Sequence, residues 1–98
     1  MICNSYYSFF SNFANRSRYD IIMALKEKPM NVTEICEKLN EEQSKVSHNL
    51  KKLTECRVLS VEQVGKNRIY SLNKSTILPI LELVGKHVKV NCPHCNKI

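Results

Sequence analysis

The chain has 98 residues, of which 43% are hydrophobic, and this length and composition suit one small globular domain. Its formal net charge is +6, from 15 lysines and arginines against 9 aspartates and glutamates, which favours a polyanionic partner but says nothing about the fold. The best apolar stretch, residues 77–84, is much shorter than the roughly 20 residues that cross a bilayer, so no membrane span is expected.

The cysteines indicate the cellular compartment. They are odd in number and irregularly spaced, which argues against an extracellular disulfide framework and for a reducing environment. The N-terminus also lacks the basic region of a secretion signal. A cytoplasmic location is therefore expected. The cysteines are Cys3, Cys36, Cys56, Cys92 and Cys95.

The first two predicted helices occupy residues 6–28. Aromatic residues at three- and four-residue intervals make an apolar stripe on the first helix; they are Tyr6, Phe9, Phe10 and Phe13. Asn15 suits the N-cap of a second helix, which turns Ile21, Ile22 and Leu25 inward and ends before Pro29.

A short helix and a longer one follow. Asn31 and Glu34 have the spacing of a capping box, which opens a third helix with Ile35 and Leu39 facing the core. After a turn at residues 40–42, a fourth helix is expected over residues 43–55. Its inward positions are Val46, Leu50 and Leu53.

From Val58 the pattern alternates, which predicts two strands over residues 58–64 and 68–72, joined by a tight turn at Gly65. A last helix is expected over residues 75–87, with Pro79 near its start, where missing N–H groups are tolerated. The predicted fold is mostly α with a β-hairpin wing, in the order α-α-α-α-β-β-α. One domain spans residues 1–90, and residues 91–98 form a CPHC tail.

Residues 33–53, TEICEKLNEEQSKVSHNLKKL, have the form of a helix-turn-helix. With the apolar residues of the fourth helix inward, its remaining faces carry side chains that can bond base edges or phosphates. A solvated polar face is the plain alternative, but the basic hairpin that follows favours DNA. The residues on these faces are Gln43, Ser44, Lys45, Ser47, His48, Lys51 and Lys52.

The segments FANRSRYDIIMAL, KVSHNLKKL and GKNRIY resemble the winged helix-turn-helix core of the ArsR family of bacterial and archaeal repressors. The resemblance covers about residues 13–72, with Arg18 at the family's usual arginine. It implies a homodimer, held by the first and last helices, that binds an imperfect palindrome in double-stranded DNA as a repressor. A winged-helix module that docks another protein without specific DNA binding is the alternative.

The resemblance also assigns residues to roles. Gln43, Ser44, Ser47 and His48 match positions that meet the major groove, Lys45, Lys51 and Lys52 match positions near phosphates or bases, and Lys66 and Arg68 match the wing. The expected dimer interface consists of Tyr6, Phe9, Phe13, Ile77, Ile80, Leu81 and Val84.

Three residues depart from the family pattern. Glu41 and Glu42 put two negative charges at the turn, where they either weaken DNA binding or cap the fourth helix. Arg57 replaces the usual glycine that closes this helix, and a left-handed backbone at a non-glycine residue costs on the order of 1 kcal/mol.

The metal-sensing motifs of the family are not reproduced. Asn31, Val32 and Thr33 stand where arsenic-responsive members have Cys-Val-Cys, and Glu82, His87 and His94 do not have the spacing of the last-helix sites. Cys36 and Cys56 are expected to be small core residues.

The CPHC tail carries two cysteines at i and i+3, which suit half of a tetrahedral zinc site. Cys92 and Cys95 then need further ligands, from the same pair in a second subunit or from Cys3, His94 or His87. A dithiol redox switch and a tail with incidental cysteines are the other interpretations. An enzyme is not expected, since no phosphate loop or nucleophile–base set is present.

Overall fold

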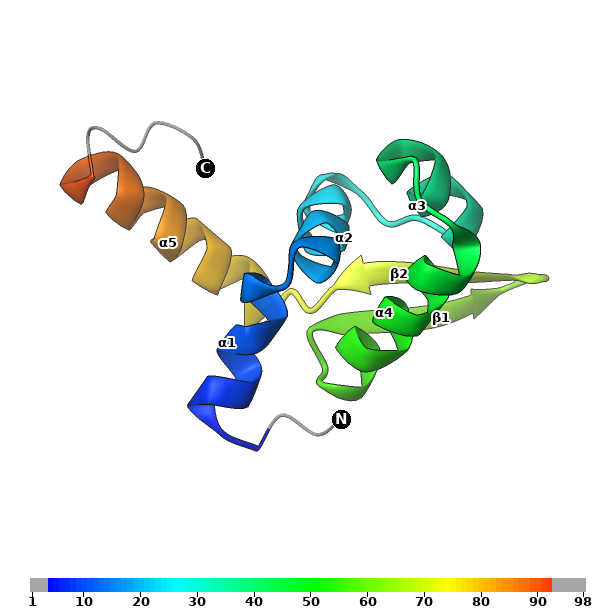
Figure 1. Ribbon diagram of the computed structural model, residues 1–98, viewed down its shortest axis with the longest axis horizontal. Coiled ribbons are helices and arrows are strands. Elements are labelled where there is room, and N and C mark those ends of the chain that lie inside the picture. The colour runs from blue at the N-terminus through cyan, green and yellow to red at the C-terminus, as the bar shows by residue number, and fades with distance from the viewer. Residues whose placement is uncertain (1–3, 93–98) are drawn as a thin grey trace.

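Five helices and one antiparallel hairpin make up the computed structural model, which describes residues 4–92 (Figure 1). The predicted fold class and element order are confirmed, and the last helix continues to Asn91 instead of ending near His87. The elements are α1 (Tyr6–Ala14), α2 (Arg16–Glu27), α3 (Val32–Leu39), α4 (Gln43–Glu55), β1 (Leu59–Val64), β2 (Asn67–Leu72) and α5 (Ile77–Asn91). No helix in residues 4–92 has the length and apolar character required to cross a bilayer.

The helix starts follow the predicted capping residues. The Asn15 side chain accepts a hydrogen bond from the Arg18 amide at 3.0 Å and caps α2. At α3 the capping box is complete, because Asn31 Oδ1 accepts from the Glu34 amide at 2.8 Å and Glu34 Oε1 accepts from the Asn31 amide at 2.9 Å. These bonds satisfy N–H groups that have no partner inside the helix.

The turn between α3 and α4 depends on one left-handed residue. Asn40 has φ of 53° and ψ of 51°, a conformation that asparagine tolerates better than most side chains. The Glu41 amide then donates to the carbonyl of Cys36 at 3.1 Å. The chain therefore leaves α3 abruptly, and α4 packs against both α3 and α2.

The hairpin lies beside α4 and projects beyond it (Figure 1). Its turn is two residues long, with Val64 paired to Asn67, and Gly65 has φ of 62°, which glycine adopts without a Cβ penalty. Tyr70 of β2 exchanges two backbone hydrogen bonds with Met30, at 3.0 and 2.8 Å. This bridge ties the segment between α2 and α3 to the sheet.

The core lies between α2, α3, α4 and the base of the hairpin. Its buried apolar side chains come from every element except α1, and α5 contributes only its first residue, Ile77. After Ile80 and Leu81, which pack against the core, α5 extends away from the rest of the chain, on the side opposite the hairpin tip (Figure 1). The buried residues are Ile21, Ile22, Ala24, Leu25, Met30, Ile35, Val46, Leu50, Leu53, Val58, Leu59, Tyr70, Leu72 and Ile77.

Candidate nucleic-acid interface

The side chains of α4 divide into an inner and an outer set. Val46, Leu50 and Leu53 are buried as predicted. Ser44, Ser47, His48 and Lys51, at i, i+3, i+4 and i+7, make one exposed stripe along the helix. We call this stripe, together with the exposed Gln43 at its start, the outer face of α4.

Two predicted lysines do not share this stripe. Lys45 and Lys52 lie on a neighbouring row that also contains the buried Asn49. Lys45 is exposed but lines a small hollow between α2 and α4 together with Asn49 and Asp20, and Lys52 is only half exposed. The structure therefore separates these two lysines from Ser44, Ser47, His48 and Lys51.

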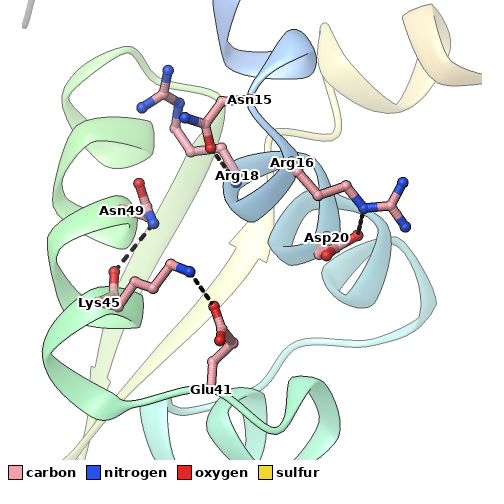
Figure 2. Close-up of polar contacts among 7 residues, drawn as sticks. All are labelled: Asn15, Arg16, Arg18, Asp20, Glu41, Lys45 and Asn49. Carbon is pink, nitrogen blue, oxygen red and sulfur yellow. Dashed lines mark hydrogen bonds and ion pairs between the residues drawn. The ribbon is translucent and has the colours of Figure 1, made fainter.

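Asn49 is a buried polar residue that the sequence analysis left out of the inner set. Its Nδ2 donates to the Lys45 carbonyl oxygen at 3.2 Å, so the buried amide is hydrogen-bonded (Figure 2). The signal was in the spacing, because Asn49 follows Val46 by three residues and precedes Leu53 by four. A pattern of apolar residues alone does not include a polar residue at such a position.

The wing brings Arg68 toward α4. Its guanidinium lies 5.9 Å from the centre of the buried Tyr70 ring, in cation–π geometry. A hollow of about 460 Å³ separates α4 from β2, and Ser47, Lys51 and Arg68 all line it. Predicted residues from the helix and the wing therefore meet here, whereas Lys66 is exposed in the hairpin turn and outside this hollow.

An ion pair stands at the first turn of α4 (Figure 2). Lys45 Nζ lies 2.8 Å from Glu41 Oε2, and this hydrogen bond, followed by the charge of Glu41, raises the pKa of Lys45. Within residues 4–92 no carboxylate is paired in this way with Lys51, Lys66 or Arg68.

Glu42 occupies the N-cap of α4 but makes no side-chain capping hydrogen bond. The expectation left two roles open for the two glutamates, weakening of DNA binding or capping of the helix. Capping by Glu42 is therefore not found, and Glu41 is engaged with Lys45 instead. Serine, threonine, aspartate and asparagine are the residues that cap best, because their short side chains reach the free amides.

Arg18 is a structural residue in this chain. Its side chain is 8% exposed, and one terminal nitrogen contacts the Ser11 carbonyl oxygen at 3.5 Å. Among the described residues its Nε has no hydrogen-bond partner. Arg18 lies in the first turn of α2, beside the Asn15 cap (Figure 2). It therefore links α2 to α1 and does not belong to the outer face of α4.

The predicted metal ligands are only partly within the described residues. Cys3, His94 and Cys95 lie outside them, whereas Cys92 is free and half-buried at the end of α5 and His87 is exposed. Residues 4–92 hold no group of three or more histidine, cysteine or acidic side chains placed to bind a metal ion.

The two other cysteines behave differently. Cys36 is a free thiol packed against the core, as expected of a small core residue. Cys56 also packs there but is disulfide-bonded, which corrects the expectation that it is only a small core residue.

The predicted dimer residues fall into three groups. Ile77 is 1% exposed and belongs to the core of the single chain, so its assignment to an interface is wrong. Four others are partly buried against that core, namely Phe9, Phe13, Ile80 and Leu81. Tyr6 and Val84 are well exposed, and large apolar neighbours that the expectation omitted are exposed with them: Tyr7, Phe10, Leu83 and Val90.

Comparison with known proteins agrees with this architecture. The model of the family described as "Bacterial regulatory protein, arsR family" matches residues 15–61, from the α2 cap into β1. A transcriptional repressor SmtB homolog from Synechocystis is 30% identical over 81 residues, which are 83% of this chain. The chain spans 61% of the length of that repressor.

Two solved structures superpose over most of the chain. The transcriptional repressor PagR of Bacillus anthracis has 30% sequence identity and a TM-score of 0.70, over 80% of this chain and 90% of its own. The homodimeric winged helix-turn-helix DNA-binding domain of Mb0332 from Mycobacterium bovis has a TM-score of 0.76, over 90% of this chain and 82% of its own. At 18% identity, this second similarity concerns the fold.

Proposed function

The chain belongs to the ArsR family of bacterial regulatory proteins, and on this premise we propose that it is a homodimeric, sequence-specific DNA-binding repressor of transcription. A family of transcriptional regulators also agrees with the expectation that the chain is not an enzyme. In the proposed complex, α4 of each subunit enters a major groove, and the two grooves lie about 34–36 Å apart on one side of the duplex.

The division of α4 is the observation that carries this proposal. Its inner side packs on the core, while its outer face presents hydroxyl, amide, imidazole and ammonium groups with no apolar side chain among them. Gln43 and Ser44, at the N-terminal end, have the chemistry for base edges, and Lys51 has the chemistry for a phosphate. A helix has the right width for the major groove.

The hollow between α4 and β2 adds support. Lys51 and Arg68 approach it from two different elements, and a DNA backbone that crosses between helix and wing would meet both cations. Lys66, at the hairpin turn, extends the same basic surface toward the adjacent backbone or minor groove. A protein-docking module, the alternative function, does not require this convergence of cations.

A homodimer would cover the apolar side chains on α1 and α5. Tyr6 is 87% exposed and Leu83 is 67% exposed, which is unusual for large apolar residues in a stable monomer. The homodimeric Mb0332 domain, which has the same fold, supports this assembly. A small domain gains buried apolar area when such faces pair.

DNA binding should depend on the outer face of α4 and on salt. We expect the wild type to enrich a palindromic site from random duplex DNA, with affinity that falls steeply as salt rises. The change Lys51→Ala should flatten the plot of log affinity against log salt by about 0.9, because one phosphate contact is lost. Gln43→Ala should cost about 1–3 kcal/mol on the enriched site, because the amide that is proposed to read a base edge is lost. Fluorescence anisotropy measures both.

Lys74→Ala is the matched control, since Lys74 is an exposed lysine in the turn between β2 and α5, away from α4. It should leave the salt dependence unchanged. If no palindrome is enriched and Lys51→Ala behaves like Lys74→Ala, the proposed function is wrong and the protein-docking alternative is favoured.

Zinc at the tail is a separate proposal. Cys92 and Cys95 supply two thiolates, and because residues 4–92 contain no cluster that completes a site, a closed tetrahedral site would take its remaining ligands from outside this range or from the second subunit.

A further inference from the structure

The ion pair between Glu41 and Lys45 lies at the point where α4 would enter DNA. Lys45 is the third residue of α4, and Glu41 precedes the helix by two residues, so the pair closes over the first turn. N-terminal residues of a recognition helix are the ones that approach bases and phosphates most closely. A negative charge at this position repels the phosphates of an approaching DNA backbone.

The backbone holds Glu41 in place. Asn40 is left-handed, and the Glu41 amide donates to the Cys36 carbonyl oxygen, so the backbone of Glu41 is fixed beside the first turn of α4. On the other side, Asn49 fixes the backbone of Lys45. Both charged residues line the small hollow between α4 and α2. The helix-turn-helix therefore sets the backbone positions from which the two side chains reach each other.

Lys45 lies beside the outer face of α4, and its ion pair distinguishes it from the basic residues proposed above to meet DNA. Lys51 and Arg68 line a hollow that Glu55 also lines, but among residues 4–92 neither cation forms an ion pair with a carboxylate. An exposed ion pair is weak, so phosphates can replace the carboxylate, but the replacement breaks the pair and leaves Glu41 beside the duplex.

We propose that Glu41 competes with DNA phosphates for Lys45 and so acts as an internal brake on the affinity of the first turn of α4. This inference rests on the proposed DNA-binding function and adds a residue that lowers affinity. The consequence is selectivity. Non-specific duplex DNA gains little affinity from Lys45, whereas at a specific site the contacts with the outer face of α4 offset the cost of displacing Glu41 from Lys45.

The test removes the charge of Glu41 with and without the lysine. Glu41→Gln is compared with wild type, and Glu41→Gln/Lys45→Ala with Lys45→Ala, on a labelled mixed-sequence duplex over a range of salt. With Lys45 present, the Glu41→Gln change should tighten binding about three- to tenfold near 0.1 M salt and steepen the salt slope by about 0.9. With Lys45 absent, the same change should leave the slope unaltered, because no lysine is released.

Glu27→Gln is the matched control. It also removes one negative charge and frees a lysine, Lys38, from an ion pair of 2.8 Å, but between α2 and α3 and outside the hollow that Glu41 and Lys45 line. Its salt slope should equal that of wild type. Equal effects of Glu41→Gln in both backgrounds, or none in either, would overturn the inference while wild-type binding stands. If wild type itself shows no salt-dependent binding to duplex DNA, the proposed function fails first. Circular dichroism confirms that each variant is folded.

Discussion

Arg57 joins α4 to the hairpin with a backbone φ of 58°, in the left-handed region. Its amide donates to the Thr54 carbonyl oxygen at 3.0 Å, and its own carbonyl oxygen accepts from Asn73 Nδ2 at 2.9 Å. These contacts use the backbone of Arg57, so the left-handed geometry serves the turn, whereas its side chain is exposed. The left-handed φ of Arg57 is therefore the backbone strain that was expected at this residue.

Glycine at residue 57 should stabilise the fold. A left-handed L-residue costs about 1–2 kcal/mol, and the greater freedom of glycine in the unfolded chain offsets about 0.5–1 kcal/mol of the gain. We therefore expect Arg57→Gly to raise the free energy of unfolding by about 1 kcal/mol, measured by urea denaturation.

Arg57→Ala separates backbone strain from charge. Alanine removes the same positive charge but keeps the Cβ atom that causes the strain, so it should not stabilise the chain. A gain in Arg57→Ala as large as that in Arg57→Gly would show that the charge, and not the backbone, determines stability at this position.

At the scale of elements, α1 and α5 differ from the other helices. The helices α2, α3 and α4 bury one face in the core, whereas α1 buries only Asn12 and α5 only Ile77. Between α2 and α5 lies a groove of about 670 Å³, whose large apolar residues on the α5 side are Leu81, Val84 and Val88. Apolar residues around helices that lack a neighbour need a partner of similar chemistry.

A charge on α5 should dissociate the proposed dimer. Leu83 is exposed in the single chain, so Leu83→Glu should leave the fold intact while it places a carboxylate in the apolar interface, where burial of an unpaired charge is costly. We expect sedimentation equilibrium to show a monomer at micromolar concentration, where the wild type is a dimer.

Lys89→Glu supplies the control for charge on the same helix, since Lys89 is already a charged, exposed residue in its last turn. It should remain dimeric. The dimer proposal would be wrong if the wild type sedimented as a monomer, or if both variants kept the same mass as the wild type.

At the scale of the whole molecule, the proposed activities are divided between two ends. The hairpin tip and the free end of α5 lie at opposite sides of the chain (Figure 1), so the surface proposed for DNA is remote from the helix that carries the CPHC tail. Two subunits joined through α1 and α5 would leave both copies of α4 exposed. Cys92, at the end of α5, would then lie at the dimer end in both subunits.

Zinc bound between subunits should appear as one ion per dimer. Two Cys92–Cys95 pairs provide four thiolates, the number a closed zinc site requires. We expect protein purified without added metal to contain about 0.5 zinc per chain by elemental analysis, and the double change Cys92→Ser/Cys95→Ser to contain none. Near-zero content in both proteins would exclude the site.

The sequence by itself determined the order of elements, because each depends on near neighbours in the chain. The Asn31–Glu34 capping box, the Gly65 turn and the inward spacing of Val46, Leu50 and Leu53 are local patterns, and the structure confirms them. The residues proposed to read DNA were also predictable in large part, since the inner positions of α4 leave only its outer face.

The tertiary structure decided what depends on packing between elements. It buried Ile77, which the pattern had assigned to an interface, because the start of α5 closes the core while the rest of the helix leaves it. It also turned Lys45 toward Glu41 and placed Arg68 opposite Lys51. Spacing along a chain predicts which residues share a helix face, but the packing of the elements determines which charged groups lie next to each residue.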